Sequence, residues 1–187
     1  MSKLTIYPDN QPDNVTLETT DGVVMAQHLN AINVRFERWE TQGILPDDAG
    51  DEQVMDAYAR DIARLQNENG YQSVDVIRIA PDNPKKDELR QKFLNEHTHS
   101  EDEVRFFVEG AGIFYLRVDG QVYMTLCERG DLISVPTGVK HWFDMGPTPD
   151  LTCIRLFTSK DGWVADFTGD DIAQKFPKFD SQEEKAA

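Results

Sequence analysis

The stretch HTHSEDEVRFFVEG, residues 97–110, contains two histidines at alternate positions followed by a β-rich run. On an extended backbone, alternate side chains project from the same face, so the imidazoles of His97 and His99 can reach one point. Glu103 begins the β-rich run and can return its carboxylate to that face. The stretch therefore predicts a strand preceded by a cluster of two imidazoles and one carboxylate.

A second stretch, GDLISVPTGVKH at residues 130–141, adds a third imidazole. Its Pro-Thr-Gly at residues 136–138 is typical of a turn between two strands, and His141 begins the second of them. A single histidine in a strand is more often structural than a metal ligand, but four suitable donors in two short segments favour metal binding. His28, the remaining histidine, is isolated in a helical pattern, and no ligand role is predicted for it.

Three neutral imidazoles and one carboxylate suit Fe(II), Ni(II), Co(II), Mn(II) or Zn(II), and the sequence does not select among these metals. A six-coordinate metal with four protein ligands keeps two positions open, whereas a structural zinc is closed by four ligands. The four candidate donors therefore favour a reactive centre.

The region from Glu103 to Ser159 is predicted to be an antiparallel β-barrel or sandwich. Its apolar runs are short and are separated by Gly, Asp or Pro turns, with no helical pattern between them. Asp119-Gly120 predicts a tight hairpin. The predicted strands are VRFFV, GIFYLRV, QVYMTL, DLISV, KHWFDM and LTCIRLF.

The N-terminal half is predicted to mix helices with strands. Asp51 is expected to cap the second helix, and Gly70 is expected to end it. The predicted elements are strands at Leu4–Tyr7 and Ser73–Ala80, and helices at Gly22–Gln42, Pro46–Gly70 and Asn83–Asn95. We expect a single domain, in which residues 1–96 pack on a barrel core at 97–159 and a polar, partly frayed tail follows at 160–187.

The composition limits the possible partners. Thirty-four acidic against nineteen basic residues give a formal charge of -15, which disfavours nucleic acid and anionic membranes and favours a monomer. The first residues lack a basic and apolar leader, and no run approaches the roughly 18 apolar residues of a membrane span, so we expect a cytoplasmic protein. Cys127 and Cys153 are predicted to be reduced core thiols rather than a disulfide.

Strand parity extends the site beyond the candidate ligands. Arg105 shares a face with Glu103, so its guanidinium is predicted to point towards the metal and to match an anionic or enolate substrate. The alternative is that Arg105 pairs with a local carboxylate. Glu96 and Asp102 are predicted either to orient the imidazoles or to be solvated surface carboxylates. Candidates for a substrate pocket are Phe143, Arg155, Phe157 and Trp163, although aromatic residues at positions such as Phe143 and Phe157 more often belong to an ordinary core.

The two stretches resemble the paired motifs of cupins, H-x-H-x3-E-x6-G and G-x5-P-x-G-x2-H, with Gly110 and Gly130 in place. Two positions depart from the usual pattern: no glycine precedes His97, and Met145 stands where asparagine often follows the last histidine. Neither position supplies a ligand. The resemblance implies a mainly β, jelly-roll-like cupin barrel with N-terminal helices packed on it.

Beyond these motifs, the chain resembles the acireductone dioxygenase family of methionine salvage. The resemblance includes the segments VRFERWETQG, YQSVDVIRI, EHTHSEDEVRFFVEGAGIFYLR and PTGVKHWFDMG. It implies that His97, His99, Glu103 and His141 bind one metal, and that Arg105 promotes the dianionic form of the substrate.

The implied substrates are O2 and acireductone, an enediol ketone with a methylthioethyl tail. With iron, the resemblance implies formate and 2-keto-4-methylthiobutyrate as products; with nickel, it implies formate, carbon monoxide and 3-methylthiopropionate. Two alternatives stay open, because cupins also include metal-dependent isomerases and decarboxylases, and because the fold can serve as a non-enzymatic module for a small ligand or a metal.

Overall fold

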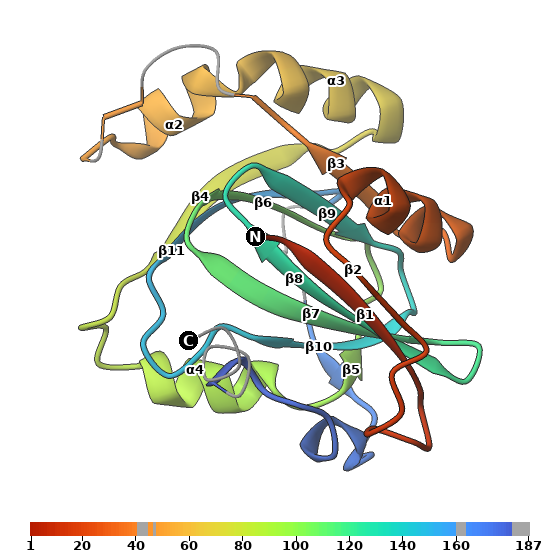
Figure 1. Ribbon diagram of the computed structural model, residues 1–187. Coiled ribbons are helices and arrows are strands. Elements are labelled where there is room, and N and C mark those ends of the chain that lie inside the picture. Colours follow the sequence, from red (N-terminus) through yellow and green to blue (C-terminus); the bar gives the residue numbers. More distant parts are fainter. Residues whose placement is uncertain (41–44, 47, 160–163, 181–187) are drawn as a thin grey trace.

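Two antiparallel sheets face each other in the computed structural model, which describes residues 1–40, 45–46, 48–159 and 164–180 (Figure 1). The first sheet consists, in spatial order, of β12 (Asp166–Phe167), β5 (His97–Thr98), β10 (Lys140–Asp144), β7 (Ala111–Val118), β8 (Gln121–Glu128), β1 (Lys3–Pro8) and β2 (Leu17–Thr19). The second consists of β3 (Arg35–Arg38), β9 (Asp131–Val135), β6 (Glu103–Glu109), β11 (Leu151–Phe157) and β4 (Ser73–Ile79). This arrangement confirms the predicted antiparallel, mainly β architecture.

The strands predicted between Glu103 and Ser159 are all present. The β7–β8 hairpin turns at Asp119 and Gly120, whose φ angles of 50° and 74° are both in the left-handed region. Two consecutive positive φ angles define the turn that matches the twist of a tight hairpin, and Asp-Gly is a preferred sequence for it. The hairpin prediction is therefore confirmed.

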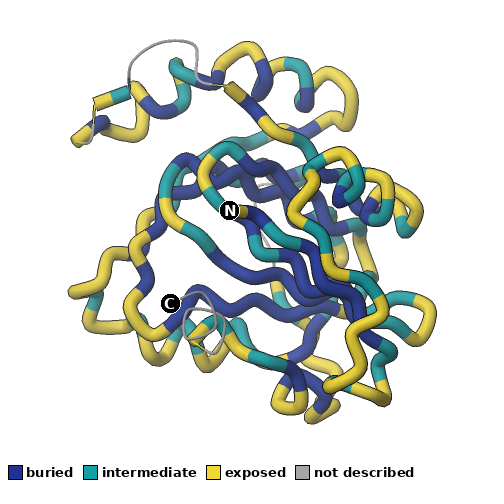
Figure 2. The backbone as a smooth tube through the Cα atoms, in the orientation of Figure 1, coloured by how far each residue is buried: buried dark blue, intermediate teal, exposed yellow. Residues whose placement is uncertain are grey.

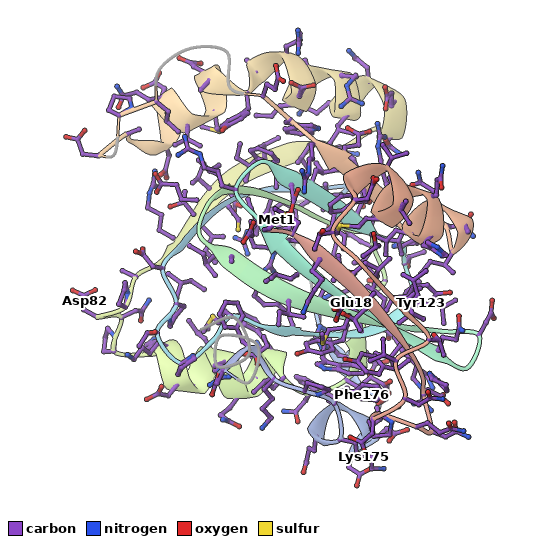
Figure 3. All side chains as sticks on the ribbon, in the orientation of Figure 1. Met1, Glu18, Asp82, Tyr123, Lys175 and Phe176 are labelled. Atoms are coloured by element: carbon purple, nitrogen blue, oxygen red, sulfur yellow. The ribbon has the colours of Figure 1, made fainter. Side chains whose placement is uncertain are left out.

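The barrel core is larger than predicted. Strands β1 and β2 join the first sheet, and β3 and β4 join the second, so four strands come from residues that were expected only to pack on a core at 97–159. Apolar side chains fill the space between the sheets (Figure 3). Phe107, Phe114 and Leu116 of this interior are fully buried.

The helix predicted over Gly22–Gln42 is wrong in its second half. Helix α1 (Gly22–Ala31) ends where Asn33 adopts a left-handed φ of 62°, and β3 follows. Val34 and Phe36 are buried while the residues between and after them are not, which is the two-residue period of a strand. This short alternation was hidden within an apparent helical recurrence.

Two helices replace the single one predicted over Pro46–Gly70. Helices α2 (Asp51–Ala57) and α3 (Ala59–Asn69) meet at Tyr58, whose φ of -120° leaves the helical region and whose ring packs 4.6 Å from that of Phe106. The predicted cap is also wrong, because Gly50 is the N-cap and Asp51 is the first helical residue. Gly70 ends α3 in a left-handed conformation, as predicted.

These two helices cover the outer face of the five-stranded sheet (Figure 1). Tyr58, Ile62 and Leu65 pack there against Phe106 and Leu132. The helices α2 and α3 are exposed on the side away from the sheet (Figure 2), which is the amphipathic pattern of a helix on a protein surface. The prediction that N-terminal helices pack on the barrel is confirmed.

The short helix predicted within Asn83–Asn95 is α4 (Lys86–Phe93), and it lies on β10. Arg90 donates two hydrogen bonds, of 2.8 and 3.1 Å, to the fully buried carboxylate of Asp144 at the end of β10. Phe93 brings the apolar face of the helix onto Phe143, with ring centroids 6.3 Å apart. These contacts of α4 with β10 hold in place the segment that immediately precedes His97.

The tail is not frayed where the structure describes it. A 3-10 helix, η1 (Ile172–Gln174), and Phe176 pack on the outer face of the seven-stranded sheet, against Tyr7 and Trp142. The Tyr115 hydroxyl donates to the Pro177 carbonyl oxygen at 2.6 Å. The polar sequence concealed these few apolar contacts, and residues 181–187 lie outside the described part of the chain.

Both cysteines, Cys127 and Cys153, are buried free thiols, which confirms the prediction. No helix in the described ranges combines the length and hydropathy needed to cross a bilayer.

Candidate metal centre

The four candidate ligands meet at one buried point. One donor atom from each of His97, His99, Glu103 and His141 lies within 4.8 Å of the others. Pairing of β5 with β10 sets His97 directly opposite His141, while Glu103 begins β6 in the other sheet. All four side chains are at most 8% exposed, so the donors lie in a low-dielectric environment that strengthens binding of a cation.

Each imidazole is oriented by a backbone carbonyl. The Nδ1 atoms of His97, His99 and His141 donate to the carbonyl oxygens of Asn95 at 2.7 Å, Val164 at 2.8 Å and Val139 at 2.8 Å, respectively. A ring that donates from Nδ1 leaves Nε2 as a lone-pair donor, which is the usual arrangement of metal-binding histidines. The cluster is therefore preorganised for a metal.

The carboxylate of Glu103 divides its two oxygens between different partners. Its Oε2 lies 3.1 Å from Nε2 of both His99 and His141, and its Oε1 accepts a hydrogen bond of 2.8 Å from Nη2 of Arg105. One oxygen thus faces the imidazoles, while the other is held by a cation. Nitrogen and oxygen donors of this type fit a divalent transition metal.

Local electrostatics keep this cluster ready for a cation. Burial and the neighbouring His141 lower the pKa of His97 to about 4, so this ring is neutral at pH 7. Burial opposes protonation of His99, but its bond with Glu103 raises the pKa of His99. Burial alone would raise the pKa of Glu103, but Arg105 and the bonds with His141 and His99 hold it well below its usual range. The carboxylate is therefore charged.

Arg105 points into the barrel beside the cluster, as strand parity predicted. Its guanidinium lies 4.5 Å from the centroid of the Phe143 ring and 5.4 Å from that of Phe114. The alternative prediction, pairing with a local carboxylate, is also realised, and that carboxylate is the candidate ligand Glu103. Both roles are thus compatible in one geometry.

Glu96 and Asp102 do not contact the imidazoles in the described hydrogen bonds. The buried carboxylate of Glu96 accepts from Thr168 Oγ1 at 2.6 Å and from Arg117 Nη1 at 3.3 Å, which ties the tail to β5. Asp102 accepts from the backbone N–H of Thr137 at 3.0 Å. Backbone carbonyls orient the rings, and a contribution of Glu96 or Asp102 to that orientation stays a prediction.

The remaining pocket candidates are distributed around Arg105. Phe143 is buried beside it, and Arg155 pairs with Arg105 across the sheet but donates two hydrogen bonds, of 2.9 and 2.6 Å, to Asp75. Phe157 lies two residues further along β11, 5.2 Å below the Arg155 guanidinium. Trp163 lies outside the described residues. Contact of these residues with a substrate stays a prediction.

Two features of the site were missed at the sequence level. The carbonyl of Val164, which orients His99, comes from 65 residues downstream, and Gly112 lies against the Phe143 ring. A carbonyl is common to every residue, so only the tertiary structure reveals such a partner.

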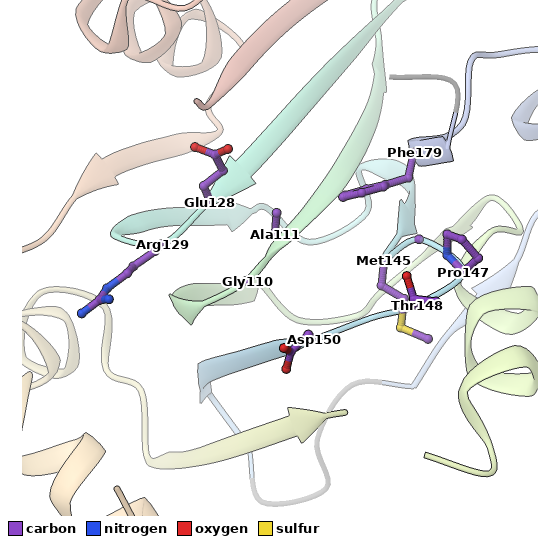
Figure 4. A pocket seen from close by; sticks show the side chains of 10 residues that line it. Gly110, Ala111, Glu128, Arg129, Met145, Pro147, Thr148, Asp150 and Phe179 are labelled. Atoms are coloured by element: carbon purple, nitrogen blue, oxygen red, sulfur yellow. The ribbon is translucent and has the colours of Figure 1, made fainter. Parts of the chain in front are cut away.

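A separate hollow of about 450 Å³ lies at the other end of β10 (Figure 4). His141 lies at the start of this strand, whereas Met145, just after its end, lines the hollow. The charged lining residues Glu128, Arg129 and Asp150 are partly or fully exposed, so water screens them. The hollow is therefore no candidate for the reactive centre.

The comparisons with known proteins agree with this geometry. The ARD/ARD' family matches residues 3–165. An acireductone dioxygenase of Parvibaculum lavamentivorans is 58% identical over 182 residues, which cover 97% of this chain and 99% of the relative. That of Hahella chejuensis is 51% identical over 186 residues and all of both chains.

A solved structure gives the same result. An acireductone dioxygenase from Bacillus anthracis, with a cadmium ion in its active centre, superposes with a TM-score of 0.76 at 29% identity, covering 89% of this chain and 98% of that one. Fold and site thus define a cupin with a candidate metal centre of three histidines and one glutamate. More narrowly, this chain belongs to the ARD/ARD' family. As a member of it, the protein is an oxygen-dependent oxidoreductase.

Proposed function

We propose that the protein is a metal-dependent dioxygenase that cleaves acireductone with O2. The observation that carries the proposal is the buried cluster of three imidazoles and Glu103, with the Arg105 guanidinium bonded to the same carboxylate. Membership of the ARD/ARD' family and relatives named acireductone dioxygenase support the substrate.

We assign His97, His99, Glu103 and His141 as the metal ligands. A bound Fe(II) or Ni(II) would supply Lewis acidity, and with only four protein ligands it would remain accessible to the oxygens of the substrate. The Nδ1–carbonyl bonds hold the three rings so that they do not reorient during the reaction, and the charged carboxylate balances the cation.

Arg105 is assigned to the substrate. Its guanidinium is a buried cation whose field is strong in the barrel interior, so it favours the deprotonated enediolate over the neutral enediol. Phe143 offers an apolar surface beside it for the thioether tail. The chain's contribution is thus to bind, orient and stabilise an anion.

The products are proposed to follow the metal: formate and 2-keto-4-methylthiobutyrate with iron, and formate, carbon monoxide and 3-methylthiopropionate with nickel. The test is to strip the protein with a chelator, reload it with either metal, and measure O2 uptake and products with acireductone. His141→Ala should abolish turnover, whereas the matched variant His28→Ala, a histidine outside the cluster, should retain it. Absence of O2 uptake by both metal-loaded forms would refute the proposal.

We further propose that the enzyme acts as a monomer in the cytoplasm. Its charge of -15 opposes self-association, and its two buried free thiols suit a reducing compartment. Light scattering after size-exclusion chromatography tests the monomer, and a mass of twice 21.3 kDa would exclude it.

A further inference from the structure

The position of Gly112 on β7 leaves no space for a side chain. A Cβ atom built there would lie 2.3 Å from Cζ and 2.5 Å from Cε2 of Phe143, far inside van der Waals contact. The backbone of Gly112 is not in the left-handed region, so its conformation would accept any residue. Close approach of the Phe143 ring is therefore the reason for glycine at this position.

The Phe143 ring has little freedom to move away. Its centroid lies 4.8 Å from that of Phe114, 6.3 Å from that of Phe93 and 6.4 Å from that of Phe107, and the residue is 3% exposed. The guanidinium of Arg105 also lies against the ring, 4.5 Å from its centroid. A group added at Gly112 must therefore displace the ring relative to Arg105.

The orientation of Arg105 affects which oxygens of Glu103 stay available to a metal, because a guanidinium can donate hydrogen bonds to both oxygens of a carboxylate. In the structure, Nη2 of Arg105 donates to Oε1 of Glu103 at 2.8 Å. Oε2 then stays on the side of His99 and His141. The aromatic faces of Phe143 and Phe114 hold the guanidinium where its Nη2 reaches Oε1 of Glu103.

We propose that Gly112 and Phe143 are positioning residues for Arg105: the missing side chain of Gly112 seats the Phe143 ring, and the ring fixes the guanidinium so that Glu103 keeps one oxygen for the metal. This inference rests on the proposed metal centre and adds two residues to its machinery. Neither residue is required to touch the metal or the substrate oxygens.

The test uses Gly112→Ala, Phe143→Leu and the double variant, with Val122→Ala as a control. Val122 is fully buried in the cluster on the outer face of β8, so its truncation destabilises the protein without disturbing Arg105. Three quantities are measured: kcat and KM for acireductone, Ni(II) affinity by competition with a chelator, and the NMR signal of the Arg105 Nε–H group in the metal-free protein. Arg105→Lys assigns that signal.

Both single variants are expected to move the Arg105 signal, because the ring current on it changes, and to lower kcat/KM on the order of 10-fold, as expected for loss of a buried cation–π contact. Ni(II) affinity should fall by roughly 3- to 10-fold, less than for loss of a direct hydrogen-bond partner of a ligand. Val122→Ala should leave the signal and the Ni(II) affinity unchanged. The double variant should melt at the temperature of Phe143→Leu, because without the ring the methyl group of Gly112→Ala has space. Its Arg105 signal should still differ from that of the wild-type protein.

A wild-type Arg105 signal in Phe143→Leu would overturn the proposal, as would equal losses in Val122→Ala or recovery of wild-type kcat/KM in the double variant. If Gly112→Ala does not fold, Phe143→Leu alone decides, since it removes the ring without overfilling the site. If the wild-type enzyme does not turn over acireductone, the proposed function fails, but the NMR and affinity measurements still test the positioning of Arg105.

Discussion

Replacing Thr168 with valine keeps the shape of the side chain but removes its hydroxyl, which donates to Glu96 and accepts from the backbone N–H of Asp170 at 3.2 Å. The Thr168 hydroxyl donates to Oε2 of Glu96 at 2.6 Å, and the Glu96 carboxylate is fully buried. The tail residue Val164, four positions earlier, supplies the carbonyl that orients His99. The substitution therefore loosens the connection between the tail and the metal centre.

The magnitude follows from the burial of Glu96. A hydrogen bond to a buried carboxylate contributes about 1.5–3 kcal/mol, and since Arg117 still pairs with the other oxygen we expect the lower part of that range, about 1.5–2 kcal/mol. For a chain of this size this corresponds to a decrease in Tm of about 3–8 °C. The affinity for Ni(II) should fall by up to about 10-fold, because His99 is the one of the three clustered imidazoles whose Nδ1 partner is distant in the sequence.

The assay combines thermal unfolding of the metal-free protein with chelator competition for Ni(II). A matched control is Thr158→Val, which removes a bond of 2.9 Å to Glu101, a carboxylate that is partly exposed. Its cost should be below about 1 kcal/mol. Equal effects of the two substitutions, or an unchanged Ni(II) affinity in Thr168→Val, would refute the reasoning.

Three further predictions concern the folded chain. Folding lowers the pKa of His97 from 6.5 to about 4 and so disfavours its protonation. The free energy of unfolding of the metal-free protein should therefore decrease by on the order of 3 kcal/mol as the pH falls from 6.5 to 4. In denaturant unfolding, His97→Gln should lack that part of the decrease. Burial raises the pKa of Cys153 to about 12, so neither it nor Cys127 should react with a thiol reagent until the protein unfolds; rapid native labelling would contradict this. Phe106→Ala removes the ring on which the outer helices pack and should cost about 3–5 kcal/mol in denaturant unfolding, and a loss below 1 kcal/mol would show that these helices pack elsewhere.

The sequence predicted those parts of the fold that depend on short local patterns. The Asp119-Gly120 turn and the alternating strands are local, and so is the spacing that brings His97 and His99 together. The break at Tyr58 was not predictable in this way, because apolar residues continue at helical spacing through it and only packing on Phe106 shows that the backbone changes direction. The strand at residues 35–38 was too short to stand out from the helical pattern before it.

The site shows the same division. Its side-chain donors were predictable because few residue types bind metals, and Arg105 followed from strand parity. Glu96 bonds to Thr168 and Asp102 to the backbone of Thr137, partners that proximity in sequence does not reveal, and a role of either carboxylate in orienting the imidazoles stays a prediction. No sequence pattern marked Gly112. The position needs a residue without a side chain because the Phe143 ring lies against it, and only the folded structure shows that contact.

The position of β1 in the seven-stranded sheet has a consequence for the order in which the molecule assembles. Lys3–Pro8 pairs with Gln121–Glu128, so this strand cannot pair with its neighbour until the ribosome has produced more than a hundred further residues. During that time its apolar segment Leu4–Tyr7 is not paired with β8, and pairings so distant in sequence are slow to form. Chaperone protection of the nascent chain is therefore expected to matter more for this protein than for a helical one of equal length.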